Sequence, residues 1–263
     1  MVSYQHIEVR VDGAIGELRL NRPADRNAMS PEMGEEIVQA VAELNGHDEL
    51  RSVLIVGAGK CFSSGGDFAL LDRLAGSRPD DGRRTMRTFY GNYLAIRELR
   101  VPTIALIHGH ALGAGLCFAL GCDIRLAAEG TKVGMTFVRV GLHPGMGATF
   151  LLSRAVGAAR AAELLLTGRV IGAQQALDMG LVSQVVPPAE LEATGRVVAE
   201  EIALCAPIAV AQLKATLRDD GHRSLGEALD REAACQAIDY ATADMAEAIA
   251  AFRGKRPPAY QGK

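Results

Sequence analysis

The sequence predicts an α/β protein, because apolar strands alternate with helices through most of its first half. The clearest signal is one pattern that occurs twice, an apolar strand followed by a glycine-rich turn and a helix. Residues 52–57 lead in this way to a helix that begins after Asp67, and residues 103–107 lead to a helix that begins at Ala114. Strands that alternate with helices form parallel sheets covered by helices. We therefore expect a wound, parallel-rich core.

The other elements of the first half follow from capping and alternation. Residues 6–11 and 14–21 alternate apolar and polar around Asp12-Gly13 and predict a hairpin. Ser30 followed by proline predicts the start of a helix, and the polar segment 76–84 is typical of a mobile loop. The remaining elements, in chain order, are a long helix through Leu99 and short strands at residues 124–127 and 132–134.

The second half is predicted to be mostly helical, with a division near residue 188. Two short strands interrupt the helices before that point, and beyond it the pattern is almost continuously helical. We therefore expect a core of residues 1–187 and a C-terminal helical region of residues 188–263. The signals are, in order, helices from about residue 148, strands at 170–171 and 181–185, a helix start at Pro207, and a capping box of Ser224 and Glu227.

Composition and charge exclude several classes of protein. The chain has 263 residues, 49% of them hydrophobic, which is enough for a sizeable core. Its net charge of −3 gives no basic field, so we expect neither nucleic acid nor a membrane as a partner. The five cysteines are odd in number and contain no Cys-x-x-Cys pair, which argues against both a disulfide framework and a metal site. Because the N-terminus also lacks a signal-peptide pattern, the sequence predicts a cytoplasmic protein.

The two strand-turn-helix units can also do chemistry. The first turn of a helix has N–H groups without intrahelical acceptors and carries partial positive charge. Glycines let a ligand approach such a turn closely, although they can equally serve tight packing. If the turns at Gly66 and Ala114 meet, their two backbone amides can share one anionic oxygen, as an oxyanion hole requires.

The residues of these turns carry a family resemblance. Phe62-Ser-Ser-Gly-Gly-Asp67 and His110-Ala-Leu-Gly-Ala-Gly115 resemble the two oxyanion turns of the crotonase superfamily, the enoyl-CoA hydratases and isomerases. The resemblance implies a crotonase-like spiral of ββα units with a C-terminal helical trimerisation region, assembled as a homotrimer or a dimer of trimers. It also implies an acyl-CoA partner, with coenzyme A as part of the substrate and no separate cofactor. Further matches cover nearly the whole chain: Leu20 to Ala28, Gly121 to Arg125, Gly141 to Gly145, Leu166 to Arg169, Gly180 to Val182 and Ala251 to Pro257.

The same resemblance implies roles for individual residues. It places the two oxyanion donors at the backbone N–H groups of Gly66 and Ala114. For Asp67, which matches a ligand-contacting position, helix capping is an equally good interpretation. The strip that lines the acyl and adenine pockets matches Ser64, Gly66, Asp67 and Phe68, and the loop that meets coenzyme A matches Arg26 and Ala28.

The sequence departs from the two-carboxylate hydratases at both catalytic positions. Cys117 and Phe137 stand where the usual glutamates would be, and residues 99–122 and 130–162 contain no Asp or Glu. Hydration needs both a base and an acid, so these positions do not support ordinary hydration. His143 is a candidate base and Cys117 a candidate thiolate, although a turn histidine and a buried core cysteine are the plainer interpretations.

Three functions remain open at this point. The first is an acyl-CoA thioester-processing enzyme of the hydratase/isomerase type, which stabilises a thioester enolate in the backbone hole. The second is a non-catalytic acyl-CoA-binding protein, and the third is a crotonase-type isomerase or another reaction that uses His143 or another base. A serine peptidase and a dinucleotide-binding protein fit less well. The second turn has no serine, and neither glycine turn has the third glycine of the dinucleotide motif.

Overall fold

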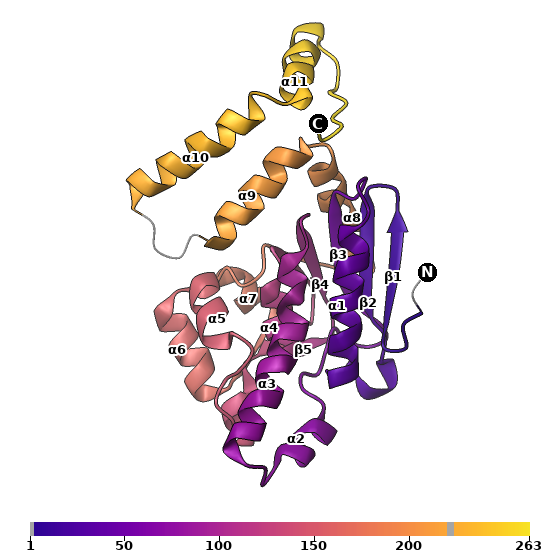
Figure 1. The fold of residues 1–263 in the computed structure, drawn as a ribbon. Helices are drawn as coiled ribbons and strands as arrows, with labels where there is room; N and C mark the ends of the chain where they lie inside the picture. The colour runs from indigo at the N-terminus through magenta and orange to yellow at the C-terminus, as the bar shows by residue number, and fades with distance from the viewer. Residues whose placement is uncertain (1–2, 220–223) are drawn as a thin grey trace.

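A six-stranded sheet forms the centre of the molecule (Figure 1). The computed structural model describes residues 3–219 and 224–263. The first two strands form the predicted antiparallel hairpin, and every later neighbouring pair is parallel, so the predicted parallel-rich α/β fold is confirmed. In spatial order the strands are β1 (Ile7–Asp12), β2 (Ile15–Leu20), β3 (Ser52–Gly57), β4 (Thr103–Ile107), β6 (Ile124–Ala128) and β9 (Gln184–Val186).

Both faces of this sheet are buried, because side chains alternate between the faces along each strand. In β4, Ala105 and Ile107 join the larger hydrophobic core, whereas Ile104 and Leu106 join the smaller core on the opposite face. Helix α8 (Leu191–Ala203) covers that opposite face. The larger core is closed by α1 (Pro31–Asn45), α3 (Pro79–Leu94), α4 (Ala114–Gly121), α5 (Ala148–Val156), α6 (Ala158–Thr167) and α7 (Ala173–Asp178).

A second, three-stranded sheet lies beside the first and carries part of the second glycine turn. Its strands are β5 (His110–Leu112), β7 (Lys132–Gly134) and β8 (Val170–Gly172), of which β5 and β7 are parallel. The stretch after β4, expected as a turn alone, therefore contains a short strand before α4 begins. Strand β7 has the predicted bounds of residues 132–134.

Three predicted elements were wrong in extent. The segment 76–84 is not one loop, because α3 begins at Pro79, where proline is favoured as the first helical residue and the acidic Asp80 and Asp81 complement the helix dipole. The long helix does not run through Leu99 but ends at Leu94, and a 3-10 turn (Ala95–Glu98) follows it. Similarly, the last strand lies at Gln184–Val186 and not at residues 181–185.

The last three helices extend away from the sheet at one end of the molecule (Figure 1). They are α9 (Pro207–Asp219), α10 (Leu225–Asp239) and α11 (Ala243–Gly254), and they include the predicted start at Pro207 and capping box of Ser224 and Glu227. The division into residues 1–187 and 188–263 stays a prediction, and α8 packs on the sheet of the first part. There Ser52 Oγ donates to the backbone oxygen of Ala199 at 3.3 Å.

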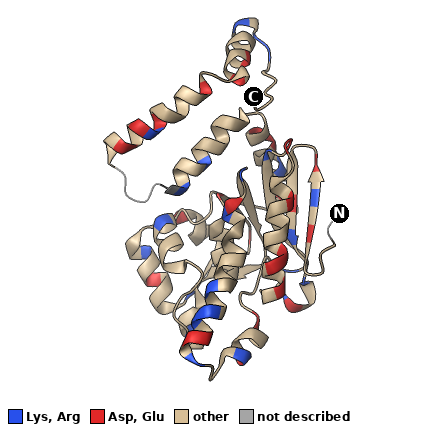
Figure 2. Ribbon diagram, in the orientation of Figure 1, with Lys and Arg blue, Asp and Glu red and all other residues tan. Residues whose placement is uncertain are grey.

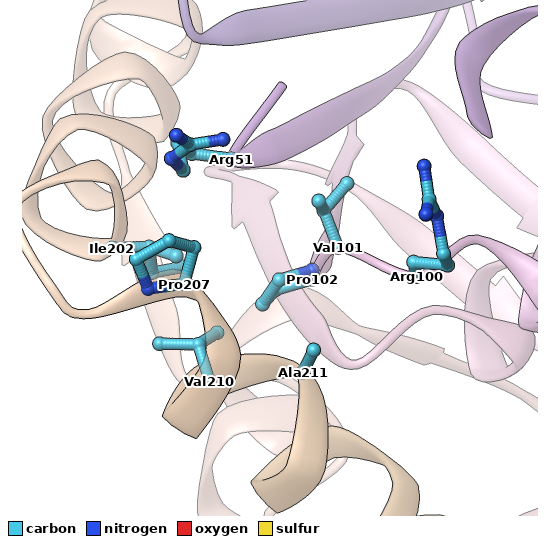
Figure 3. Close-up of a pocket in the computed structure, with 8 residues that line it drawn as sticks. All are labelled: Arg51, Arg100, Val101, Pro102, Ile202, Pro207, Val210 and Ala211. Atoms are coloured by element: carbon cyan, nitrogen blue, oxygen red, sulfur yellow. The ribbon is translucent and has the colours of Figure 1, made fainter. Parts of the chain in front are cut away.

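Helix α9 contacts the residue that precedes β6 through an ion pair in which the lysine is buried. Lys214 Nζ lies 2.8 Å from Asp123 Oδ2, and the lysine side chain is only 4% exposed. Asp123 also accepts hydrogen bonds from the backbone N and the Oγ1 of Thr103, both at 2.8 Å. Figure 3 shows the nearby seam, where Pro207, Val210 and Ala211 approach Val101 and Pro102 and leave a crevice of about 10 Å³. That volume is room for about one water molecule, so the seam is not a substrate site.

Charges are mixed over the fold. Both acidic and basic residues lie along α3 and α10 (Figure 2). In the described part of the chain, no helix has the length and apolar character needed to span a bilayer.

Candidate functional site

The backbone N–H of Gly66 points away from Met29, the residue opposite Gly66 in a short parallel bridge. Met29 N donates to Gly65 O at 2.8 Å and Asp67 N donates to Met29 O at 3.0 Å, which forms a parallel bridge opposite Gly66. In such a bridge the residue between the two bonded groups directs its own N–H to the other side. Among residues 3–219 and 224–263 that N–H has no acceptor. The amide is therefore available to a ligand.

The backbone N–H of Ala114 is available for a different reason. Ala114 is the first residue of α4, so its N–H has no carbonyl four residues earlier within the helix. Its neighbours are occupied, since Gly113 N donates to Gly134 O at 2.8 Å and Cys117 N donates to Gly113 O at 3.1 Å. The positive end of the helix dipole adds to the pull of this amide on an anion.

The two turns are held together directly. Ser63 N donates to His110 O at 3.1 Å, and Leu112 N donates to Ser63 O at 3.2 Å. Glycine makes this approach possible, because a Cβ on Gly115 would lie 2.8 Å from the Cβ of Ser63. The segment that carries Gly66 is thus packed against the segment that carries Ala114, as the sequence predicted.

A cavity of about 490 Å³ opens beside these two amides. Its size is in the range of small-molecule sites, and most of its wall is apolar, as in such sites. Helices α2 (Phe68–Leu74) and α3 supply much of one wall, and the 3-10 helix Thr136–Val140 supplies part of another. The polar side chains on the wall are Ser64, Asp72, Tyr90, Thr136 and His143, and the larger apolar ones are Phe68, Leu70, Leu71, Leu74, Met86, Phe89, Phe137, Val140, Leu142 and Met146.

The predicted catalytic positions differ in their surroundings. Phe137 lines the cavity, and its ring tip approaches Gly113, on which a Cβ would lie 3.9 Å from the ring Cζ. Cys117 is fully buried and does not line the cavity, and its Sγ lies 3.6 Å from the backbone oxygen of Gly145. Burial raises the pKa of the Cys117 thiol well above its usual range, so the group stays protonated.

His143 lies on the cavity wall with Gly66 and Ala114, and it is exposed. Its Nδ1 is 2.8 Å from the backbone oxygen of Pro144. No carboxylate of the described residues pairs with its ring. The ring is therefore oriented by a backbone group alone, which leaves Nε2 to face the cavity or solvent.

Three polar groups on the wall were missed in the sequence. Asp72 is the one carboxylate that lines the cavity among the described residues, and it is exposed on α2. The stretches without Asp or Glu, residues 99–122 and 130–162, surround the second turn, whereas Asp72 follows the first turn by about one and a half helical turns. Tyr90 and Thr136 reach the wall from α3 and from the 3-10 helix. Only their place in a helix next to the site could have suggested them.

Asp67 caps a helix and holds a loop. Its Oδ1 accepts a hydrogen bond from Ala69 N at 2.9 Å, and its Oδ2 pairs with Arg22 Nη1 at 2.9 Å. Burial acts to raise the pKa of this carboxyl, but the Ala69 amide and the Arg22 guanidinium outweigh it and lower the pKa. The capping interpretation of Asp67 is confirmed, and its side chain does not line the cavity.

A second hollow, about 580 Å³ in volume, is lined by Arg26 and Lys60 and by residues near them in the chain. Its charged residues, Arg26 and Lys60, are basic, and no acidic residue lines it within the described chain. Burial and the neighbouring Arg26 lower the pKa of His110, which also lines it. The two hollows are neighbours, because Ser64 lines the apolar cavity and its N donates to the O of Arg26 at 3.0 Å. Ala28 contributes a backbone oxygen that accepts from Arg22 Nη1 at 2.8 Å and lines neither hollow.

The fold and the site together define a class of protein. It is an α/β protein in which two backbone amides, without an acceptor in the described part of the chain, lie on the wall of a large apolar cavity, next to a basic hollow. The family model of enoyl-CoA hydratase/isomerase matches residues 10–263. This chain therefore belongs to the enoyl-CoA hydratase/isomerase family, within the crotonase superfamily, as the resemblance indicated.

Similar proteins support the same assignment. The chain is 33% identical to a probable enoyl-CoA hydratase of Mycobacterium bovis, over 98% of this chain and 99% of the relative. It is 34% identical to a 1,2-epoxyphenylacetyl-CoA isomerase of Escherichia coli, over 96% and 97%. Among solved structures, an enoyl-CoA hydratase from Bacillus anthracis superposes with a TM-score of 0.92 at 34% identity, covering 98% of this chain and 100% of that one. A structure described as a putative enoyl-CoA hydratase from Streptomyces coelicolor gives a TM-score of 0.94 at 32% identity, covering 100% and 96%.

Proposed function

We propose that this protein binds an acyl-CoA thioester and polarises its carbonyl between the backbone amides of Gly66 and Ala114. The acyl chain occupies the apolar cavity, and the phosphate-bearing part of coenzyme A lies toward the basic hollow. The observation that carries the proposal is the pair of N–H groups on the cavity wall that find no acceptor among residues 3–219 and 224–263. Each such donor is worth about 3 kcal/mol when negative charge develops on the oxygen.

The basic hollow supports the same orientation of the ligand. Arg22 is already paired with Asp25 at 2.7 Å and with Asp67 at 2.9 Å. Arg26 and Lys60 are exposed, and neither forms an ion pair within residues 3–219 and 224–263. Phosphate groups would therefore meet Arg26 and Lys60 first.

The proposed chemistry is stabilisation of a thioester enolate without the usual pair of carboxylates. Cys117 is a buried thiol and Phe137 has no titratable group. A proton would have to be moved by another group on the wall, and His143 and Asp72 are the side chains placed to exchange it with solvent. The relatives include hydratases and an isomerase, so isomerisation with one of these groups as base remains the closest alternative reaction.

A non-catalytic acyl-CoA-binding protein is the second candidate function. The observation that favours it is the wall itself, which among the described residues has a single, exposed carboxylate. Binding needs only the hole, the cavity and the basic hollow, whereas turnover also needs a proton-transfer group. The two candidates agree on binding and differ on turnover alone.

The test of the proposed hole replaces one of its donors. Ala114→Pro removes the N–H at the first position of α4, where proline is tolerated in a helix. We expect the carbonyl stretch of bound, carbonyl-labelled butyryl-CoA to shift to lower frequency in the wild type and to shift less in the variant. We also expect affinity to fall by about fivefold, because one hydrogen bond is worth about 1 kcal/mol net.

The matched control is Ala158→Pro, which places proline at the first position of α6, on an exposed residue outside the cavity. It should leave both the spectrum and the affinity unchanged. An unshifted carbonyl in the bound wild type would refute the hole. Turnover of any enoyl-CoA by the wild type would decide for an enzyme over a binding protein.

A further inference from the structure

Tyr90 presents a phenolic hydroxyl to an otherwise mostly apolar wall. It lies on α3 next to Phe89, whose ring it meets edge-on with centroids 6.2 Å apart, and it is half-buried. Phe89 is buried in the core, and Tyr90 lines the cavity together with Gly66, Ala114 and Phe137. Helix α3 therefore places Tyr90 on the wall of the cavity in which we propose that the acyl chain binds.

The hydroxyl of Tyr90 has no hydrogen-bond partner in the described part of the chain, unlike three other tyrosines. Tyr93 donates to the backbone oxygen of Ser30 at 2.6 Å, Tyr4 to Glu43 at 2.7 Å, and Tyr240 to Gln236 at 3.4 Å. The oxygen is not one of the buried polar atoms without a partner, so solvent can reach it. A phenol that loses this water normally finds a partner, and leaving it unpaired costs free energy. An acyl chain that fills the cavity takes the place of solvent around Tyr90, so the hydroxyl then needs an acceptor on that chain.

Two contacts relate the hydroxyl to the helix that begins at Ala114. It packs against Gly145, where an added Cβ would overlap the phenolic oxygen. Gly145 in turn contacts Cys117, whose Sγ is 3.6 Å from its backbone oxygen. Cys117 is one helical turn beyond Ala114, the proposed oxyanion donor. These contacts favour the part of the acyl chain near the thioester, around the β-carbon, as the partner of Tyr90.

Tyr90 is suited to donate a hydrogen bond and not to act as a base. Burial, together with the neighbouring Cys117, raises the pKa of its hydroxyl. A phenol whose pKa is raised stays protonated across the physiological pH range. It can therefore offer its O–H to an oxygen of the ligand at any working pH.

We propose that Tyr90 selects acyl groups that carry a hydrogen-bond-accepting oxygen at the β-carbon, such as 3-hydroxyacyl-CoA, over plain hydrocarbon chains. This inference rests on the proposed function, since it requires the acyl chain to lie in this cavity. A site built to hydrogen-bond a ligand oxygen discriminates against the analogue without it, because the donor is then left unpaired. Tyr90 is thus a specificity-determining residue.

The test compares two thioesters that differ by one hydroxyl, butyryl-CoA and 3-hydroxybutyryl-CoA, each enantiomer being titrated calorimetrically. We expect the wild type to bind one enantiomer of 3-hydroxybutyryl-CoA about tenfold more tightly than butyryl-CoA. Tyr90→Phe should remove this preference and leave the affinity for butyryl-CoA equal or higher. The matched control is Tyr240→Phe, the same chemical change on an exposed tyrosine of α10, which should keep the wild-type preference.

The titrations distinguish a wrong role for Tyr90 from a wrong proposed function. Equal affinity of the wild type for all three thioesters would overturn the role of Tyr90 and leave the proposed function intact. An equal loss of affinity for all of them in Tyr90→Phe would also overturn it, because the residue would then be structural. If none of the thioesters bound the wild type, the proposed function would fail, and this inference with it.

Discussion

The hydration of crotonyl-CoA is the reaction that most directly tests the altered catalytic positions. We expect the wild type to hydrate it about 10³-fold or more slowly than a two-carboxylate relative. Water must be activated and the α-carbon protonated, and neither Cys117 nor Phe137 can do either, since one is a buried, protonated thiol and the other a phenyl ring. The proposed hole at Gly66 and Ala114 would remain.

The expected decrease in the hydration rate follows from the groups that are absent from the cavity wall and from those that are present. An acid and a base are each worth about 10² to 10⁴ in rate. Solvent, Asp72 or His143 at exposed positions can recover part of this. A net loss of about 10³ corresponds to about 4 kcal/mol of transition-state stabilisation. Binding should be nearly unaffected, so the loss should be seen in kcat more than in KM.

Introducing one glutamate at a time, at residue 137 or residue 117, should give different results at the two positions. Phe137→Glu should raise the hydration rate by about 10²-fold, because this side chain already lines the cavity and reaches toward Gly113. Cys117→Glu should instead destabilise the fold by several kcal/mol, since residue 117 is fully buried beside Met135. Phe68→Glu is the matched control, because Phe68 also lines the cavity but is 68% exposed, and it should not raise the rate.

The assay follows the loss of the enoyl-thioester absorbance at saturating substrate. A wild-type kcat above about 10² s⁻¹, in the upper part of the usual enzyme range, would refute the reasoning from the missing carboxylates. In that case Asp72→Asn and His143→Gln would identify the group that acts as the base. Equal rates for Phe137→Glu and Phe68→Glu would refute the placement of residue 137.

The remaining predictions concern stability and assembly. Asp67→Asn keeps a good helix cap but loses the ion pair with Arg22. We expect a loss of about 1 kcal/mol at pH 7. Because folding lowers the pKa of Asp67 from its ordinary value of 3.8, this stabilisation is fully present well above pH 3.8, begins to decline near that pH and is lost only as pH falls through the lower folded pKa. The difference between the two proteins in urea denaturation should shrink over the same range. Lys214→Met should cost about 1 to 2 kcal/mol, because Asp123, whose side chain is 26% exposed, loses its cation. Lys132→Met, on an exposed lysine, should cost little. Light scattering should give three or six times the 27.8 kDa mass of one chain, because a partner subunit would bury the exposed leucines of α9 and α10. These leucines are Leu213, Leu217, Leu225 and Leu229. A monomer at micromolar concentration would contradict this prediction.

The sequence was sufficient for the features that local rules determine. The cap at Ser30, the strands that lead to both turns and the starts of α2 and α4 all follow from capping residues, glycine placement and apolar runs within a short window. The contact between the two turns was inferred because the same local pattern occurs twice. The start of α3 was not predicted, because Gly76 and the charged residues after it are typical of a loop. Pro79 favours the first helical turn, and the helix begins at this residue.

The features that the sequence could not supply depend on contacts between distant segments. Spacing places residue 117 one turn after Ala114, but it does not show that the side chain turns into the core and away from the cavity. Tyr90 reaches the cavity only because α3 packs beside α4, and Asp72 only because α2 forms part of the wall. No local pattern distinguishes these residues from their neighbours on the same helices.

The arrangement of the polar groups has a consequence for how this cavity can work. The two amides and the dipole of α4 stabilise negative charge on an oxygen whatever produces that charge. Cys117, buried behind the wall, and Tyr90, which lines it, have raised pKa values and stay neutral, so they add no competing charge near the amides. Titratable groups that can exchange protons, Asp72 and His143, are exposed. Charge stabilisation and proton transfer are therefore separated in space, and loss of the amide at Ala114 should impair both binding and turnover, while loss of an exposed group should impair turnover alone.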